Sequence, residues 1–305
     1  MSPGIDQRVR LTAFEFLKGL QNIHGELLPR EKLVKGFLYE DRRVPLMGPQ
    51  GIFKPAILPE IPISITTSPV IEGRSRPYED SIDYGGYLRY RYRGTNPQHH
   101  ENIGLRSAMT SKTPLIYFHG IAKSLYLAFW PVFIVGDDPR TLTFTVVVDQ
   151  PQQLAAAQES FSTPEADARR RYCTVEVQQR VHQQGFRHRV LKAYRETCAI
   201  CRLKHTELLE AAHILPDGHP KGEPTVVNGI SLCNIHHAAY DKQIIGIRPD
   251  YRVVVREDVL KEVDGPMLLH GLQGFNNSKL ILPARKSEYP NPEFLAERFA
   301  EFKAS

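Results

Sequence analysis

Two short cysteine and histidine pairs constrain this chain more than any other feature. Cys198 and Cys201 form a C-x2-C pair, and Cys233 and His236 form a C-x2-H pair further along the chain. Zinc prefers a tetrahedron of thiolate and imidazole ligands, which two such pairs supply when a loop brings them together. We therefore expect these four residues to bind a structural zinc ion. The alternative, a set of buried free thiols, leaves His236 and His237 unexplained.

The rest of the composition agrees with a metal-binding role for these cysteines. The chain has four cysteines among 305 residues, and three of them lie close to histidines. No apolar run reaches the length of about eighteen residues that a membrane helix needs, and the first residues carry charges where a signal peptide is apolar. We therefore expect a soluble, cytoplasmic protein without membrane contact, in which cysteines bind metal rather than form disulfides.

Basic residues concentrate between positions 169 and 204, immediately before and into the first cysteine pair. The net charge of the whole chain is only +5, so the bias is local. A basic run is compatible with contact to nucleic-acid phosphates, although a solvated helix face has the same composition. The candidates for DNA contact here are Arg187, Arg189 and Lys192. The apolar residues that share one face of a helix in the same segment are Phe186, Val190, Leu191 and Tyr194.

The hydrophobic pattern divides the chain into a β-rich first part and a mixed second part. Short aromatic and β-branched runs such as "PLIYFHGI" and "TLTFTVVVD" alternate with turn residues and predict a small barrel or a strongly curved sheet. We predict an α+β protein with a β-rich recognition domain over 1–155, a linker and basic segment over 156–180, and a second domain over 181–305.

Four polar residues near the cysteine pairs are not needed for zinc. "LLEAAHILP" reads as a strand carrying His213, Asn228-Gly229 is a turn signal, and "HHAAYDKQ" reads as the start of a helix. On that helix His237 and Asp241 are four residues apart, so both side chains point the same way and can hold a divalent metal ion. Taken singly, His213 is compatible with a core histidine and Asp241 with a surface carboxylate.

Taken together, these motifs resemble the HNH endonucleases of the ββα-metal type. Residues 198–246 have the family's order of a histidine on the first strand, an asparagine near the second and a histidine on the helix, at His213, Asn228 and His237. Many members add a zinc frame, which Cys198, Cys201, Cys233 and His236 would form here. The amino-acid sequence of residues 186–250 is similar to that of the bacterial restriction-type HNH proteins.

The resemblance implies a mechanism for each of these residues. His213 would be the general base that takes a proton from water, and Asn228 would orient it. His237 and Asp241 would bind the catalytic Mg²⁺, Mn²⁺ or another divalent ion. Many members have a metal-binding residue where this chain has Ala212. Glu210 lies on the same side of the predicted strand and could complete the metal site, although a surface carboxylate is the alternative.

The short sequence motifs of the β-rich part follow an order similar to that in the SRA and related PUA-like domains, which fold as curved β-barrels. SRA members bind a flipped modified cytosine, and a flipped base needs aromatic faces and a polar group for its edge. An aromatic core face beside a solvated basic face is the alternative interpretation. The candidates for DNA contact in this part are Tyr84, Tyr87, Tyr90, Asp83, Arg89 and Arg91.

Both resemblances together predict a modification-dependent restriction endonuclease that cuts double-stranded DNA carrying methylated or hydroxymethylated cytosine. One alternative is an HNH nuclease that reads unmodified sequence or DNA structure in repair or homing. Another alternative is a DNA-binding regulator that no longer cuts. It stays open because Ala212 stands where many family members have a metal-binding residue. Cutting both strands needs two active sites or two successive nicks, and a homodimer would provide the two sites.

Overall fold

The computed structural model describes residues 4–69, 81–82, 87–149 and 164–304. The chain forms two compact units, Met1–Val181 and His182–Ser305, and helix α4 (Pro164–Ala193) contributes residues to both. Tyr84 and Asp83, two of the candidates for DNA contact, lie outside the described residues. Among the helices of the described segments, none has the length and apolar character needed to cross a membrane.

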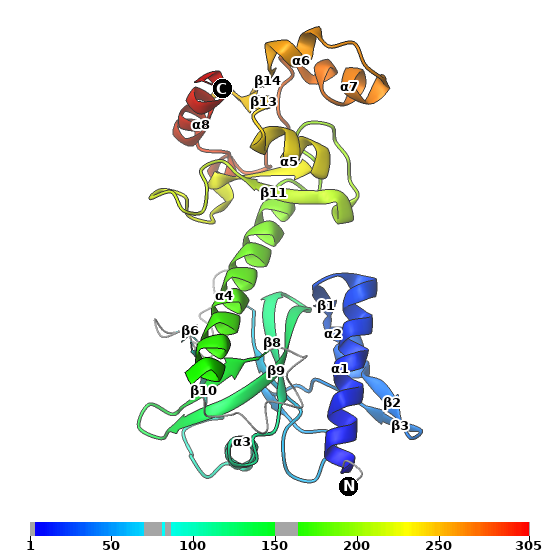
Figure 1. Ribbon diagram of the computed structural model, residues 1–305, viewed down its shortest axis with the longest axis vertical. Coiled ribbons are helices and arrows are strands. Elements are labelled where there is room, and N and C mark those ends of the chain that lie inside the picture. Colours follow the sequence, from blue (N-terminus) through cyan, green and yellow to red (C-terminus); the bar gives the residue numbers. More distant parts are fainter. Residues whose placement is uncertain (1–3, 70–80, 83–86, 150–163, 305) are drawn as a thin grey trace. The chain divides into compact units, whose positions relative to one another are not determined.

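The first unit is built on an eight-stranded mixed sheet (Figure 1). All strand pairs of this sheet are antiparallel except β5 (Ser64–Thr67) with β8 (Leu115–Ala122). The strands follow the order β4 (Ile52–Phe53), β5 (Ser64–Thr67), β8 (Leu115–Ala122), β9 (Leu125–Asp138), β10 (Thr143–Val148), β7 (Leu88–Arg91) and β6 (Ser81–Ile82), with β1 (Leu27–Pro29) beside β9.

The sheet curls into a half-barrel. Strands β5 and β7 are separated by three strands in the sheet order, yet the Tyr90 hydroxyl of β7 donates a hydrogen bond to the Thr66 carbonyl of β5 at 3.3 Å. The register between β9 and β10 shifts between Thr145 and Val146, and such bulges increase the local twist of a sheet. The curved sheet expected from the sequence is therefore present in this unit.

Both faces of the central strands are covered, which explains why β8 is an almost continuous apolar run. Ile116 and Phe118 of β8 pack with helix α1 (Ile5–His24), whereas Leu115 and Tyr117 belong to the opposite core. That second core also receives apolar residues of α3 (His100–Thr110) and of the first half of α4. The remaining elements of the unit are α2 (Arg30–Lys35), β2 (Phe37–Tyr39) and β3 (Arg42–Val44).

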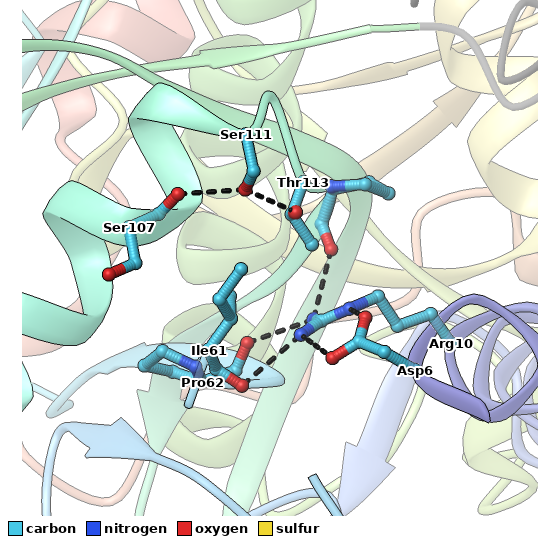
Figure 2. A network of polar contacts seen from close by, with 8 residues as sticks. Asp6, Arg10, Ile61, Pro62, Ser107, Ser111 and Thr113 are labelled. Carbon is cyan, nitrogen blue, oxygen red and sulfur yellow. Dashed lines mark hydrogen bonds and ion pairs between the residues drawn. The ribbon is translucent and has the colours of Figure 1, made fainter. Parts of the chain in front are cut away.

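A buried arginine attaches α1 to the loops around the sheet (Figure 2). The Arg10 guanidinium is 2% exposed and pairs with Asp6 one turn earlier on the helix, with 2.6 Å between Nε and Oδ1. It also donates to the carbonyls of Ile61, Pro62 and Pro114 at 2.8–3.2 Å. A buried charge is costly unless it is paired and hydrogen-bonded, and Arg10 meets both conditions.

Helix α4 is held against the sheet by a second buried ion-pair cluster. The Asp149 carboxylate, directly after β10, pairs with Arg169 at 2.8 Å and with Arg170 at 2.9 Å. The side chains of Asp149 and Arg170 are 0% and 2% exposed. The backbone N–H of Val148 also donates to the Thr174 hydroxyl at 3.1 Å, so the helix and the strand are joined by polar as well as apolar contacts.

The second unit contains a ββα arrangement. Strands β11 (Leu209–His213) and β12 (Gly229–Cys233) pair antiparallel, with His213 opposite Gly229, and lead directly into helix α5 (Asn234–Asp241). The other elements are β13 (Ile245–Ile247), β14 (Val253–Val255), α6 (Glu257–Lys261), α7 (Pro266–Gly271), α8 (Pro292–Ala304) and the 3-10 turns Thr206–Leu208, Val226–Asn228, Gln273–Phe275 and Lys286–Glu288.

A single core joins the elements of this second unit. The C-terminal part of α4 contributes Phe186, Val190 and Tyr194, and all three are buried among residues of β11, β12 and β13. Helix α8 closes the other side, where Phe302 lies so close to Gly246 that a Cβ atom at that glycine would sit 2.5 Å from its ring. Helix α8 therefore packs closely on β13.

Candidate active site and metal centre

The four predicted zinc ligands lie together in the second unit. Their ligand atoms all lie within 4.8 Å of one another, and three of the four residues are buried. A tetrahedral site with Zn–S bonds of about 2.3 Å has S···S edges of about 3.8 Å. The Sγ atoms of Cys201 and Cys233 are 3.8 Å apart, and Nδ1 of His236 lies 3.1 Å from the Cys233 sulfur. The cluster therefore fits a tetrahedral metal ion such as zinc.

Neighbouring groups prepare this cluster for metal binding. His236 Nε2 lies 2.9 Å from the Gly271 carbonyl, so it donates its proton there and leaves Nδ1 free for the metal. The thiols of Cys198 and then Cys201 hydrogen-bond the Cys233 sulfur and hold the pKa of Cys233 below its usual range. A thiolate is the metal-binding form of cysteine, so both effects favour coordination.

His213 ends strand β11 in a half-buried position, at the opposite end of the strand pair from Cys233. Its imidazole stacks on the Phe186 ring, with 4.0 Å between the centroids and 20° between the planes. Its Nε2 is buried and has no hydrogen-bond partner among the residues that the structure describes. Burial is the main cause that lowers the pKa of His213 below its ordinary value, with smaller effects from nearby charges. The imidazole is therefore kept neutral at physiological pH, as a general base requires.

Asn228 fixes the chain that follows His213. Its fully buried side chain accepts a hydrogen bond from the Leu215 N–H at 2.9 Å and donates to the carbonyls of Leu215 and Glu223, both at 3.1 Å. Its own backbone carbonyl accepts from the Ile214 N–H at 2.9 Å. The Asn228 side chain, with two donors and an acceptor, satisfies three backbone groups here. These bonds fix the path of the chain directly after His213.

His237 and Asp241 lie side by side on α5. His237 Nε2 is 3.2 Å from Asp241 Oδ2, and the two side chains are 27% and 55% exposed. Both residues affect the pKa of His213 through their charges, and so does Asp217. The three are therefore within electrostatic range of the imidazole. The sequence gives little reason to select Asp217, which occupies an ordinary Pro-Asp-Gly turn after β11.

The structure does not bring Glu210 together with this pair. The Glu210 carboxylate lies 3.4 Å from the Arg187 guanidinium, and the Cys/His cluster is the only group of three or more ligand atoms found in the described part of the chain. Ala212 is fully buried in the core, so its position faces the protein interior.

The basic candidates of the second unit have different surroundings. Arg187 donates to the carbonyls of Leu209 and Thr206 at 2.7 and 2.8 Å and so attaches α4 to the start of β11. Arg189 donates to the Pro224 carbonyl at 2.8 Å but stays exposed, and Lys192 is exposed. Arg189 and Lys192 are therefore accessible to a phosphate, whereas Arg187 has a structural role in β11.

The described candidates of the first unit lie on and beside β7. Tyr90 is only 5% exposed and belongs to the core. Tyr87 is half-buried, and Cζ of Arg171 lies over its ring, 5.7 Å from the ring centroid. Arg89 donates to the Thr145 hydroxyl at 2.8 Å, and Arg91 is exposed.

A pocket opens where the two ends of the half-barrel meet. Its volume is about 190 Å³, and its lining includes Gly51, Thr66, Tyr90 and Arg91. Oγ1 of Thr66 is buried and has no hydrogen-bond partner within the described segments. The pocket thus brings the polar end of an aromatic side chain together with an exposed cation.

Comparison with known proteins agrees with the geometry of the second unit. Residues 198–248 match the family model of the HNH endonucleases. No curated protein matches the chain. A solved structure titled "Modification dependent TagI restriction endonuclease" is 15% identical over 79% of this chain and 82% of that chain, with a TM-score of 0.29, which is too low to indicate a shared fold. Residues 198–248 are therefore similar to the HNH endonucleases, and the protein is an enzyme with a nuclease domain.

Proposed function

We propose that the protein is a metal-dependent endonuclease that cuts DNA carrying a modified cytosine, with residues 181–305 cutting and residues 1–155 selecting the substrate. The observation that carries the proposal is the arrangement of His213, Asn228, His237 and Asp241 on one ββα segment. Each of the four has surroundings that suit a distinct role in phosphodiester hydrolysis.

His213 acts as the general base. Because its burial holds the pKa below the ordinary value, the imidazole is neutral near pH 7 and accepts a proton from the attacking water. Asn228 keeps the backbone after His213 in place through its three hydrogen bonds. General bases of this kind contribute about 10²–10⁴-fold to a rate, provided that they are held within reach of the water.

His237 and Asp241 would hold the catalytic divalent ion, Mg²⁺ or Mn²⁺. Their 3.2 Å separation on an exposed helix face offers one nitrogen and one carboxylate oxygen to the same ion. Such an ion neutralises charge on the phosphate and on the leaving oxygen. Glu210 as a further ligand stays a prediction, and it would have to leave Arg187 to take part.

The Cys/His cluster binds a structural zinc ion. The ligand types and the 3.8 Å sulfur separation support zinc over a hard cation, which prefers oxygen ligands. Cys198 and Cys201 follow α4, and Cys233 and His236 join β12 to α5, so one ion ties three elements together.

The pocket of the first unit receives the flipped base. The curled sheet supports this proposal because a curved β-sheet is what the SRA/PUA-like resemblance of the sequence implies, and Tyr90 belongs to the lining of the pocket. Aromatic stacking and hydrogen bonds to a base edge are what base-flipping proteins use. Arg91 at the same pocket is exposed and suits a phosphate beside the flipped nucleotide.

Matched plasmids test the proposal. Unmodified DNA and DNA with 5-methylcytosine or 5-hydroxymethylcytosine are incubated with the protein and Mg²⁺ or Mn²⁺. We expect cleavage of modified DNA only, and no cleavage by a folded His213→Ala variant that keeps its zinc.

Other outcomes point to the alternatives. Equal cleavage of all plasmids would mean that the first unit reads unmodified sequence or DNA structure. Binding without cleavage under every metal condition would make the protein a DNA-binding regulator. Cleavage at the wild-type rate by a folded His213→Ala variant would show that His213 is not the general base.

A further inference from the structure

The residue in closest ring contact with His213 is Phe186, which lies on α4 and outside the HNH motif. The two rings are nearly parallel, 4.0 Å apart, and Phe186 is 2% exposed. A stacked aromatic ring restricts its partner to one plane, because tilting either ring would open a gap or create a clash in a tightly packed core.

The position of Phe186 is itself fixed by the strand opposite His213. Gly229 is the register partner of His213, and a Cβ atom at Gly229 would lie 2.8 Å from Cζ of Phe186 and 2.4 Å from Cγ2 of Val190. Helix α4 therefore packs directly on the backbone of β12. The Phe186 ring cannot move toward β12, and its face stays against the imidazole.

No hydrogen-bond partner at Nε2 fixes the orientation of the His213 imidazole. Catalytic histidines are commonly oriented by a carboxylate or a carbonyl that hydrogen-bonds the second ring nitrogen. Here Nε2 is enclosed and has no such partner in the described parts of the chain. The stack on Phe186 is thus the contact that remains to hold the ring.

We propose that Phe186 is a positioning residue, which fixes the plane of the His213 imidazole and keeps water from one of its faces. The proposal rests on the role of His213 as the general base. A ring that can rotate away from the attacking water would lose part of the contribution of the base, while the DNA would bind as before.

The test compares Phe186→Met with Val190→Ala in the full-length protein. Methionine has a similar volume without a flat face, and Val190 is a fully buried neighbour that contacts the same glycine. Tyrosine is unsuitable because a hydroxyl on Cζ would meet Gly229. The measurements are the single-turnover cleavage rate with Mg²⁺, the DNA dissociation constant without divalent ions, the zinc content and the thermal midpoint.

We expect Phe186→Met to slow cleavage by about tenfold or more while DNA affinity changes by less than about twofold. Val190→Ala should lower the thermal midpoint but keep the cleavage rate within about twofold at a temperature where it is folded. Equal rate losses in the two variants, or no loss in Phe186→Met, would overturn the positioning role.

The wild-type protein offers a readout that does not depend on a variant. Ring protons of a histidine stacked on phenylalanine are shifted upfield in NMR spectra, and those of His213 should show this shift. Unshifted signals would overturn the proposal even if Phe186→Met failed to fold. Failure of the wider function is distinguishable, because it would appear as no cleavage by the wild-type protein or as full activity of His213→Ala.

Discussion

Nε2 of His237 lies 3.2 Å from Oδ2 of Asp241, one helical turn further along α5. Both groups are partly exposed, and the pair lies within electrostatic range of His213. The general base and the two metal-binding groups of the proposed mechanism therefore come from two elements, β11 and α5, that the ββα arrangement packs together.

Asp241→Asn should weaken binding of the catalytic ion without unfolding the protein. Asparagine keeps the shape but removes the charge that attracts a divalent cation, so the Mg²⁺ concentration for half-maximal cleavage should rise at least about tenfold. Asp258→Asn is the matched control, because Asp258 is similarly exposed in the same unit and pairs with Arg256. A rise of equal size in both variants would mean a general charge effect instead of a metal ligand.

The pH dependence of cleavage should reflect the lowered pKa of His213. The base works in its neutral form, which predominates above its pKa, and burial extends that form to lower pH. At saturating Mg²⁺ the acid limb of the rate profile should therefore have its midpoint below about 6.5, the ordinary value for histidine. A midpoint at or above the ordinary value would contradict a desolvated base at this position.

Removal of a zinc ligand should destabilise the second unit. Cys198→Ser should reduce the zinc content, measured by elemental analysis, and lower the thermal midpoint, because metal binding and folding are coupled in such sites. Cys173→Ser is the control: Cys173 is also buried, but it belongs to the core of the first unit. Normal zinc content in Cys198→Ser would exclude this residue as a ligand.

Sequence spacing was sufficient to locate the Cys/His cluster and the positions of the ββα residues. Short pairs such as Cys233 and His236 lie within one turn of chain, so their proximity follows from local geometry alone. The same holds for His237 and Asp241 on one helix. The face of α4 that carries Phe186, Val190 and Tyr194 was also predictable from helical spacing, and these residues are buried.

Contacts between distant segments could not be predicted in this way. Arg187 reaches Glu210 and the carbonyls of β11 only because α4 packs on the strand pair. The sequence left two interpretations open for the aromatic residues of β7, a base-binding face and an aromatic core face, and Leu88, Tyr90 and Tyr92 belong to the core. The curl that brings Tyr90 to Thr66 depends on the entire sheet.

Gly51→Ala should close part of the pocket in the first unit. An added Cβ atom would lie 2.9 Å from the Tyr90 hydroxyl and 3.3 Å from the Thr66 carbonyl, and both residues line the pocket. If a modified base enters there, its affinity should fall by about tenfold, the usual order of effect when a fitted contact is lost. The variant should still cut bound DNA at the wild-type rate, because the residues of the second unit are unchanged.

Gly19→Ala is the control for this prediction. Gly19 is in helix α1 of the same unit, where an added methyl group meets no atom within 4 Å. Binding of duplexes with and without modified cytosine is measured for both variants by fluorescence anisotropy. Loss of modified-base preference in Gly51→Ala alone supports the pocket as the reader. Unchanged preference in Gly51→Ala would place recognition elsewhere, since Gly51 lines this pocket.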